Sequence, residues 1–195
     1  MPTGTISETA MSETIKQGPS EEQAICVTCG LCCDGTLFRH AILNPGEKGN
    51  LPQKIEESVF SEGEKEYFVL PCPYFSGKCS IYDRKRADVC FGYRCQLLKD
   101  FNKGKVSLDE TLDIIREAMN NRNALIEEYR RVTGRDNAPY FMILLRELGK
   151  IQESVTEKEP LGIDYEVLLA RCNILEALLI KHFRSVEDFE KMIMK

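Results

Sequence analysis

The chain has no tryptophan and only two histidines, His40 and His182, among its 195 residues. It lacks the basic start and apolar run of a signal peptide, and no stretch reaches the roughly 18 apolar residues that cross a bilayer. Its net charge of −5 argues against a nucleic acid partner, because phosphate groups bind to basic surfaces. We therefore expect a cytoplasmic protein with neither a nucleic acid nor a membrane as partner.

Motifs of common enzyme classes are also missing. No glycine-rich loop follows a predicted strand, no nucleotide-binding loop is present, and no serine, histidine and aspartate stand in an evident catalytic pattern. The sequence therefore assigns no catalytic residue and leaves open whether the protein is an enzyme. The two histidines are more typical of surface or hydrogen-bonded residues than of ligands, and His40 is the better outside candidate.

Cysteine is the unusual feature, because the chain has nine cysteines and eight of them lie between residues 26 and 95. In a protein without an export signal, clustered cysteines are more often metal ligands or redox groups than disulfides. Composition divides the chain into a flexible acidic tail at 1–24, a cysteine-rich metal-binding domain at 25–104 and a helical region at 105–195. We expect a protein partner to dock on the helical region.

The first four cysteines follow the pattern Cys26-x-x-Cys29-x-x-Cys32-Cys33. Two-residue gaps let successive thiolates converge on one centre while backbone N–H groups point at the sulfurs, as in zinc knuckles and iron–sulfur loops. Gly30 permits the tight backbone path that such a loop needs. Adjacent side chains rarely reach the same tetrahedral ion. We therefore expect Cys32 or Cys33 to serve a second centre or to be a reactive thiol.

A second group of cysteines follows downstream, and eight ligands in all suit two four-cysteine sites. The sequence does not decide which metal is bound. Zinc sites prefer pairs such as Cys90-x4-Cys95, whereas a cysteine triplet completed by Cys72-Pro73 is similar in outline to a bacterial iron–sulfur run. We expect Zn²⁺ or an iron–sulfur cluster, such as a 4Fe-4S cluster, as the cofactor. The predicted metal ligands are Cys26, Cys29, Cys32, Cys33, Cys72, Cys79, Cys90 and Cys95.

Basic residues are interleaved with the later cysteines. A four-thiolate site with zinc or an oxidised four-iron cluster carries a charge of about −2, which nearby cations would compensate. A solvated basic turn, ion pairs with neighbouring aspartates, or a phosphate contact are the alternatives. Tyr82 and Tyr93 are expected to pack around the site. The candidate compensating residues are Lys78, Arg84, Lys85, Arg86 and Arg94.

Local patterns predict the regular elements. Short apolar runs predict strands at 36–43 and 67–70. Ser107 and Glu110 form a capping-box pattern, which predicts a helix that ends near Gly134. Its predicted apolar stripe consists of Leu108, Leu112, Ile115, Met119, Ile126 and Tyr129.

Three further helices are predicted beyond Gly134. One runs from near Pro139 to Gly149, one follows Asp164 as its cap, and one follows Ser185. Cys172 falls on the apolar stripe of the helix after Asp164 and is expected to be a core residue. The fold class that results is α+β and helix-rich. In it, a metal-stapled, cysteine-rich unit with few short strands packs on three to four helices.

At the cysteine motifs the chain resembles the YkgJ-type cysteine-cluster family, which is described as a zinc- or iron-chelating domain. The family usually has proline where this chain has Ala87, and one extra residue lies between Tyr82 and Arg86, so the departure affects a turn more than the ligands. The resemblance implies metal chelation and does not extend past residue 101. The matching stretches are Cys26-x-x-Cys29-Gly30-x-Cys32-Cys33, Cys72-Pro73-x-Phe75, Cys79-Ser80-Ile81-Tyr82 and Arg86-Ala87-Asp88-Val89-Cys90.

Three functions are compatible with these features. A non-catalytic metal-binding module is favoured, because all recognisable chemistry lies in the ligands. An iron–sulfur redox or modification-helper enzyme would use the cysteine triplet together with a spare Cys33. A metal delivery or sensing protein would use the adjacent Cys32 and Cys33 for ligand exchange.

Overall fold

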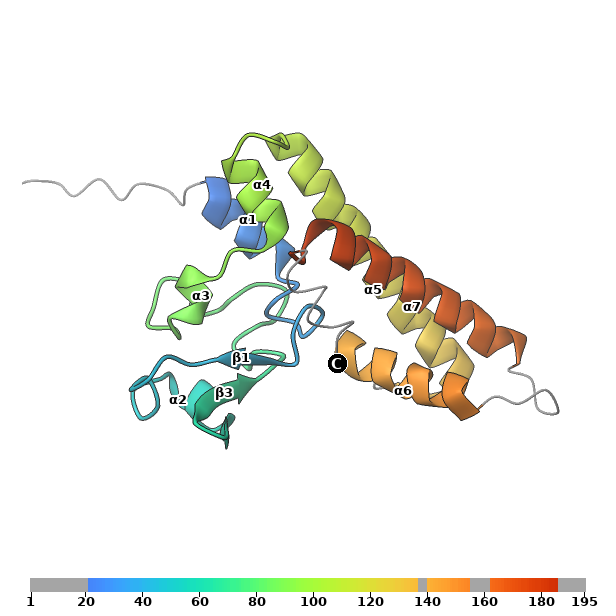
Figure 1. Ribbon diagram of the computed structural model, residues 1–195, viewed down its shortest axis with the longest axis horizontal. Coiled ribbons are helices and arrows are strands. Elements are labelled where there is room, and N and C mark those ends of the chain that lie inside the picture. The colour runs from blue at the N-terminus through green and yellow to red at the C-terminus, as the bar shows by residue number, and fades with distance from the viewer. Residues whose placement is uncertain (1–20, 137–139, 155–161, 186–195) are drawn as a thin grey trace, which may run out of the picture.

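The computed structural model describes residues 21–136, 140–154 and 162–185. Figure 1 shows a helical part beside a part made of short strands, loops and small helices, so the predicted helix-rich α+β class is confirmed. Residues 21–24 of the predicted acidic tail belong to the first helix. Residues 1–20 and the predicted helix after Ser185 lie outside the described residues. No helix within the described ranges is both long enough and apolar enough to cross a bilayer.

Helix α5 (Leu108–Thr133) is the longest element of the helical part. The hydroxyl oxygen of Ser107 accepts from the backbone N–H of Glu110 at 3.2 Å, and the Glu110 carboxylate accepts from the backbone N–H of Ser107 at 2.8 Å. The helix ends at Gly134, which has the left-handed conformation with φ of 66°. The predicted start and end of this helix are confirmed, because both depend on local chemistry.

The predicted stripe of α5 is only partly right. Ile115 and Tyr129 are buried, but Leu108 is 37% exposed and Ile126 is half-buried. Over 26 residues, steps of three, four and seven drift around a helix with 3.6 residues per turn, so a stripe drawn from sequence leaves the core side. The buried positions of α5 are Thr111, Ile115, Ala118, Leu125 and Tyr129.

Two further helices complete the helical part. Helix α6 (Phe141–Ser154) begins close to where the sequence predicts and extends beyond Gly149. Helix α7 (Ile163–His182) packs along α5. Its N-cap residue is Gly162, so the prediction of Asp164 as the cap is wrong, and Asp164 lies inside the first turn. Cys172 is fully buried between the helices, as predicted.

The strands form a small antiparallel sheet with the order β1-β3-β2. Strand β1 (His40–Ile42) and strand β3 (Lys65–Val69) overlap the two predicted strands, whereas strand β2 (Val59–Glu62) was not predicted. Phe68, in the central strand β3, lies opposite Ala41 of β1 and Val59 of β2 and is 1% exposed. It belongs to a small second core, with Leu43, Ile55, Leu70, Ile81 and Ala87.

Four short helices lie in the cysteine-rich region, and none of them was predicted. They are α1 (Glu21–Cys29), α2 (Gln53–Glu56), α3 (Val89–Gly92) and α4 (Gln96–Asn102). Helices α1 and α4 both pack on α5 and place Ile25, Leu97 and Leu98 in the large core. The first cysteines and Cys95 are therefore anchored to the helical part.

Candidate metal centre

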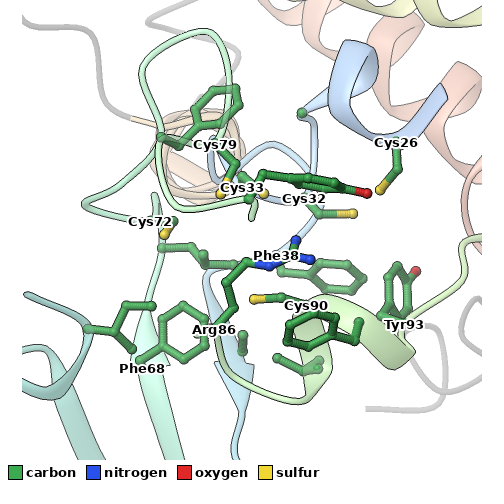
Figure 2. Close-up of a pocket in the computed structure, with 18 of the residues that line it drawn as sticks. Cys26, Cys32, Cys33, Phe38, Phe68, Cys72, Cys79, Arg86, Cys90 and Tyr93 are labelled. Carbon is green, nitrogen blue, oxygen red and sulfur yellow. The ribbon is translucent and has the colours of Figure 1, made fainter. Parts of the chain in front are cut away.

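All eight predicted ligands border two adjoining cavities. Cys26 and Cys29 lie on α1, Cys95 is the N-cap residue of α4, and Cys90 lies on α3. The larger cavity, of about 440 Å³, and the smaller one, of about 40 Å³, are both bordered by Cys26, Cys32 and Cys33. Cys72, Cys79 and Cys90 border only the larger cavity (Figure 2). Cys29 and Cys95 border only the smaller one.

A backbone hydrogen bond joins the two cysteine-bearing stretches of chain. The N–H of Cys72 donates to the carbonyl oxygen of Cys33 at 2.8 Å. The turn around Cys33 is tied to α5 by an ion pair between Asp34 and Arg122, whose side chains are both mostly buried. These bonds fix the position of the first motif relative to both the loop after β3 and the helical part.

Gly30 ends α1 and makes the turn that separates the early cysteines. Its φ of 63° lies in the left-handed region that favours glycine. A Cβ atom at this position would stand 2.5 Å from the ring of Phe75, a contact that real Cβ atoms do not make. From the sequence, the reason for a glycine at this position is the tight backbone path of the loop. The close approach of Phe75 is a second reason that spacing could not show.

Four of the sulfurs form what we call the first set: Cys26, Cys29, Cys32 and Cys95. Burial raises the pKa of each of these thiols, and that of Cys29 rises to about 12. After burial, the largest effects on the pKa of Cys32 come from the other three members of the set, each of which raises it. The electrostatic neighbours of Cys32 are therefore the thiols of its own set.

The other four sulfurs form the second set: Cys33, Cys72, Cys79 and Cys90. Burial raises the pKa of Cys33 to about 12, and Cys90 and Cys72 are the next causes. Burial also raises the pKa of Cys90 to about 11, with Cys72 next. The strongest neighbours of the adjacent residues Cys32 and Cys33 thus differ, and Cys26 also raises the pKa of both. Figure 2 shows Cys32 pointing toward Cys26 and Cys33 pointing toward Cys79.

Backbone N–H groups point at three of the sulfurs. Burial raises the pKa of Cys29, Cys72 and Cys95, and hydrogen bonds from backbone N–H groups two or three residues further along oppose the rise. This is the arrangement that the two-residue gaps predict for knuckle loops, and it stabilises the charged sulfur. The donors belong to Leu31 for Cys29, to Tyr74 for Cys72, and to Leu98 and Leu97 for Cys95.

Arg86 lies between the two sets. Its guanidinium group stacks on the rings of Tyr82 and Phe91, with centroid distances of 4.2 and 4.1 Å, and reaches into the larger cavity (Figure 2). Burial raises the pKa of Cys26 and of Cys90, and the charge of Arg86 opposes the rise in both. Its Nε atom is buried and has no hydrogen-bond partner in the described part of the chain.

The other predicted compensating residues are placed differently. Arg94 forms an ion pair with Glu22 on α1 and donates to the carbonyl oxygen of Tyr93 at 3.0 Å. Lys78, Arg84 and Lys85 are exposed. Tyr82 and Tyr93 border the larger cavity, as the sequence predicts. The rest of the aromatic wall was not predicted from the sequence, and it includes Phe38, Phe68, Phe75 and Phe91.

The cysteines are free thiols and form no disulfide with one another. Over the ranges that the structure describes, no three histidine, cysteine, aspartate or glutamate side chains stand together closely enough to hold one metal ion. The sulfurs therefore face shared cavities without forming a closed cage. Eight sulfur donors with N–H groups directed at three of them are chemically suited to zinc and to iron–sulfur clusters.

Comparisons with known proteins identify no relative. No protein-family model matches the chain, and no match was found to a curated protein or to a solved structure. The resemblance to the YkgJ-type family therefore stays a prediction that depends on the cysteine motifs alone.

Proposed function

We propose that the protein binds metal at two four-cysteine sites, one formed by the first set of sulfurs and one by the second. The observation that carries this proposal is the division of the thiols between the two cavities: Cys29 and Cys95 border only the smaller one, and Cys72, Cys79 and Cys90 border only the larger one. The strongest electrostatic neighbours of Cys32 are Cys29 and Cys95, whereas those of Cys33 are Cys90 and Cys72. One tetrahedral ion or cluster takes four thiolates, and each set supplies four.

The environment of the sulfurs supports this proposal. Burial disfavours thiolates without a metal, because it raises the pKa of Cys29 and Cys33 to about 12. A bound cation reverses this preference, since it replaces the protons and compensates the negative charge. Arg86, placed between the two sets, would compensate part of the charge that remains.

The most suitable role is that of a non-catalytic, metal-stapled module. The strands and loops around the second set have a small core of their own, centred on Phe68 and Ile55. Metal bonds would contribute folding free energy that this core does not supply. The helical part would then carry the surface that meets a protein partner.

A second candidate is an iron–sulfur redox or modification-helper enzyme. It is favoured by the larger cavity, whose volume of about 440 Å³ lies in the range of small-molecule sites, and by its wall of aromatic side chains. Catalytic metal sites keep an open position, and the second set borders this cavity. In the first set, Cys29 and Cys95 border only the smaller cavity, and Cys26 and Cys32 border both cavities.

Elemental analysis and an absorption spectrum of anaerobically purified protein test both candidates. An iron–sulfur protein is brown and carries iron with acid-labile sulfide, whereas a zinc protein is colourless with stoichiometric zinc. Cys29→Ser and Cys79→Ser, one in each set, should each remove about half of the metal, and the double variant nearly all of it. Cys172→Ser is the matched control and should leave the metal content unchanged.

Two results would count against the proposal. Protein that holds no metal after expression with ample iron and zinc would contradict metal binding. Complete loss of metal from either single variant, with an intact fold by circular dichroism, would contradict two separate sites and favour one shared centre.

A further inference from the structure

Helix α7 has apolar side chains on two opposite sides. One side packs on α5 and includes Leu168, Cys172, Leu175 and Leu179, all fully buried. The other side is exposed, although a surface helix ordinarily has polar residues there. Figure 1 shows α7, in red, along the outer edge of the helical part.

The exposed apolar residues of α7 form one continuous line, which we call the outer stripe. Ile163 is 78% exposed, Val167 39% and Ile174 57%, and Ala170 and Ala177 are exposed between and after them. Single exposed apolar residues are common and need no explanation. Here the steps alternate between four and three residues, which is the heptad spacing of a helix that packs on another helix.

The charges at the two ends of α7 favour a second copy of the same helix as the occupant. Glu166 lies in the first turn and Lys181 in the last turn, and both are exposed. Asp164, also in the first turn, forms an ion pair with Arg131 of α5. When two such helices run antiparallel, the acidic end of each lies against the basic end of the other, and the helix dipoles oppose as well. A parallel pair would instead bring like charges together.

The side chains of the outer stripe also fit this arrangement. In one antiparallel register Ala170 lies opposite the partner's Ile174, and Val167 lies opposite the partner's Ala177, so each small side chain meets a branched one. The same residues then serve on both copies, as a two-fold symmetric interface requires.

We propose that the outer stripe of α7 pairs antiparallel with the outer stripe of a second copy of this chain, forming a two-fold symmetric dimer. The interface does not depend on metal binding, because none of the five stripe residues borders either cavity. Loss of metal by a cysteine variant and loss of the dimer by a stripe variant are therefore separate results.

The oligomeric state of the full chain tests the proposal. Sedimentation velocity over a range of concentrations should show a monomer–dimer equilibrium. Ile174→Glu should raise the dissociation constant by about tenfold or more, because it places a carboxylate without a partner in an apolar contact. The control is Val69→Glu, at a β3 position that is 47% exposed, and it should leave the equilibrium unchanged.

Charge variants test the orientation. Glu166→Lys should weaken an antiparallel dimer by roughly two- to fivefold, because in this register the new lysine lies within one helical turn of the partner's Lys181. The double variant with Lys181→Glu should restore the affinity. In a parallel dimer, position 166 of each copy meets position 166 of the other, so Glu166→Lys would replace one like-charge pair with another and leave the affinity unchanged.

Three outcomes would overturn the proposal. The first is a full-length chain that stays monomeric at every concentration, including the case in which Ile174→Glu lowers its melting temperature because another part of the same chain covers the stripe. The second is a dimer that Ile174→Glu does not weaken. The third is a dimer whose affinity Glu166→Lys leaves unchanged, because this would contradict the antiparallel orientation.

Discussion

The helical part and the strand-and-loop part of this protein differ in how much interior each has. Within the described residues, the core under the helices contains 19 buried residues, whereas the core beside the sheet contains six. The first set of cysteines is anchored to the large core through Ile25 and Leu97. Most of the second set belongs to the part with the small core. We therefore predict that metal bound at the second set would contribute more to folding than metal bound at the first, because small cores need other bonds.

Removal of metal should have the largest effect, and an unequal one. Structural zinc contributes about 10–16 kcal/mol to small zinc-dependent domains, so a strong chelator should unfold the strand-and-loop part and spare α5 and α7. Hydrogen exchange measures this directly: backbone amides of β1 and β3 should lose protection, and those of α5 should keep it. Unchanged protection in β3 after complete metal removal would refute this difference between the two parts.

Lowering the pH should have the next largest effect, and it should weaken metal binding at both sets. Burial raises the pKa of Cys29 and Cys33 to about 12 and that of Cys90 to about 11, so these thiols are protonated at neutral pH when no metal is bound. Loading one set then releases about four protons, and the apparent affinity should fall by up to about four orders of magnitude for each unit that the pH is lowered.

This pH dependence can be measured by competition with a chelator between pH 6 and 8, together with a count of released protons. The sign follows from the thiols: protons and metal compete for the same sulfurs, so lower pH favours the metal-free form. Affinity that does not change with pH would indicate that the ligands are not these thiols. The strand-and-loop part should lose its hydrogen-exchange protection as metal leaves.

A cavity in the large core should have an intermediate effect that involves the helical part. Leu175 is fully buried between α7 and α5, and Leu175→Ala should lower the free energy of unfolding by about 2–5 kcal/mol. Urea denaturation followed by circular dichroism measures this. Ile42→Ala, at a strand position that is 45% exposed, is the control and should change it by less than about 0.5 kcal/mol.

The cap of α5 should contribute least. Ser107→Ala removes the hydroxyl that accepts from Glu110 and should lower the free energy of unfolding by about 1 kcal/mol. Ser107→Asp keeps an acceptor at this position and should cost less than the alanine variant. The same denaturation experiment compares the two, and an equal loss from both would show that the cap does not stabilise the helix.

Local chemistry explains which elements could be predicted. The capping box of Ser107 and Glu110 and the C-cap residue Gly134 are recognisable in the sequence, so the bounds of α5 could be predicted. Helix α1 lacks such signals, because apolar residues are not gathered on one side of it, and it is held by the packing of Ile25 in the large core. Strand β2 has no clear strand pattern in its sequence and is defined by its antiparallel pairing with β3.

The candidate site follows the same rule. The spacing of the cysteines singled out eight of them as candidate ligands. It could not assign Cys32 and Cys95 to one set, because these residues lie far apart in the chain and come close only in the folded structure. Likewise, nothing near Gly30 in the sequence indicates that the ring of Phe75 lies against it. The division into sets and the aromatic wall depend on contacts between distant segments.

Cys172, the one cysteine outside both sets, is fully enclosed in the large core. An alkylating reagent added to the native protein therefore reports on the two sets with no background from this residue. Cys172 becomes labelled only when α7 separates from α5. Mass spectrometry of the labelled peptides would thus follow the accessibility of the sulfurs and the melting of the helices in the same sample, without any engineered probe.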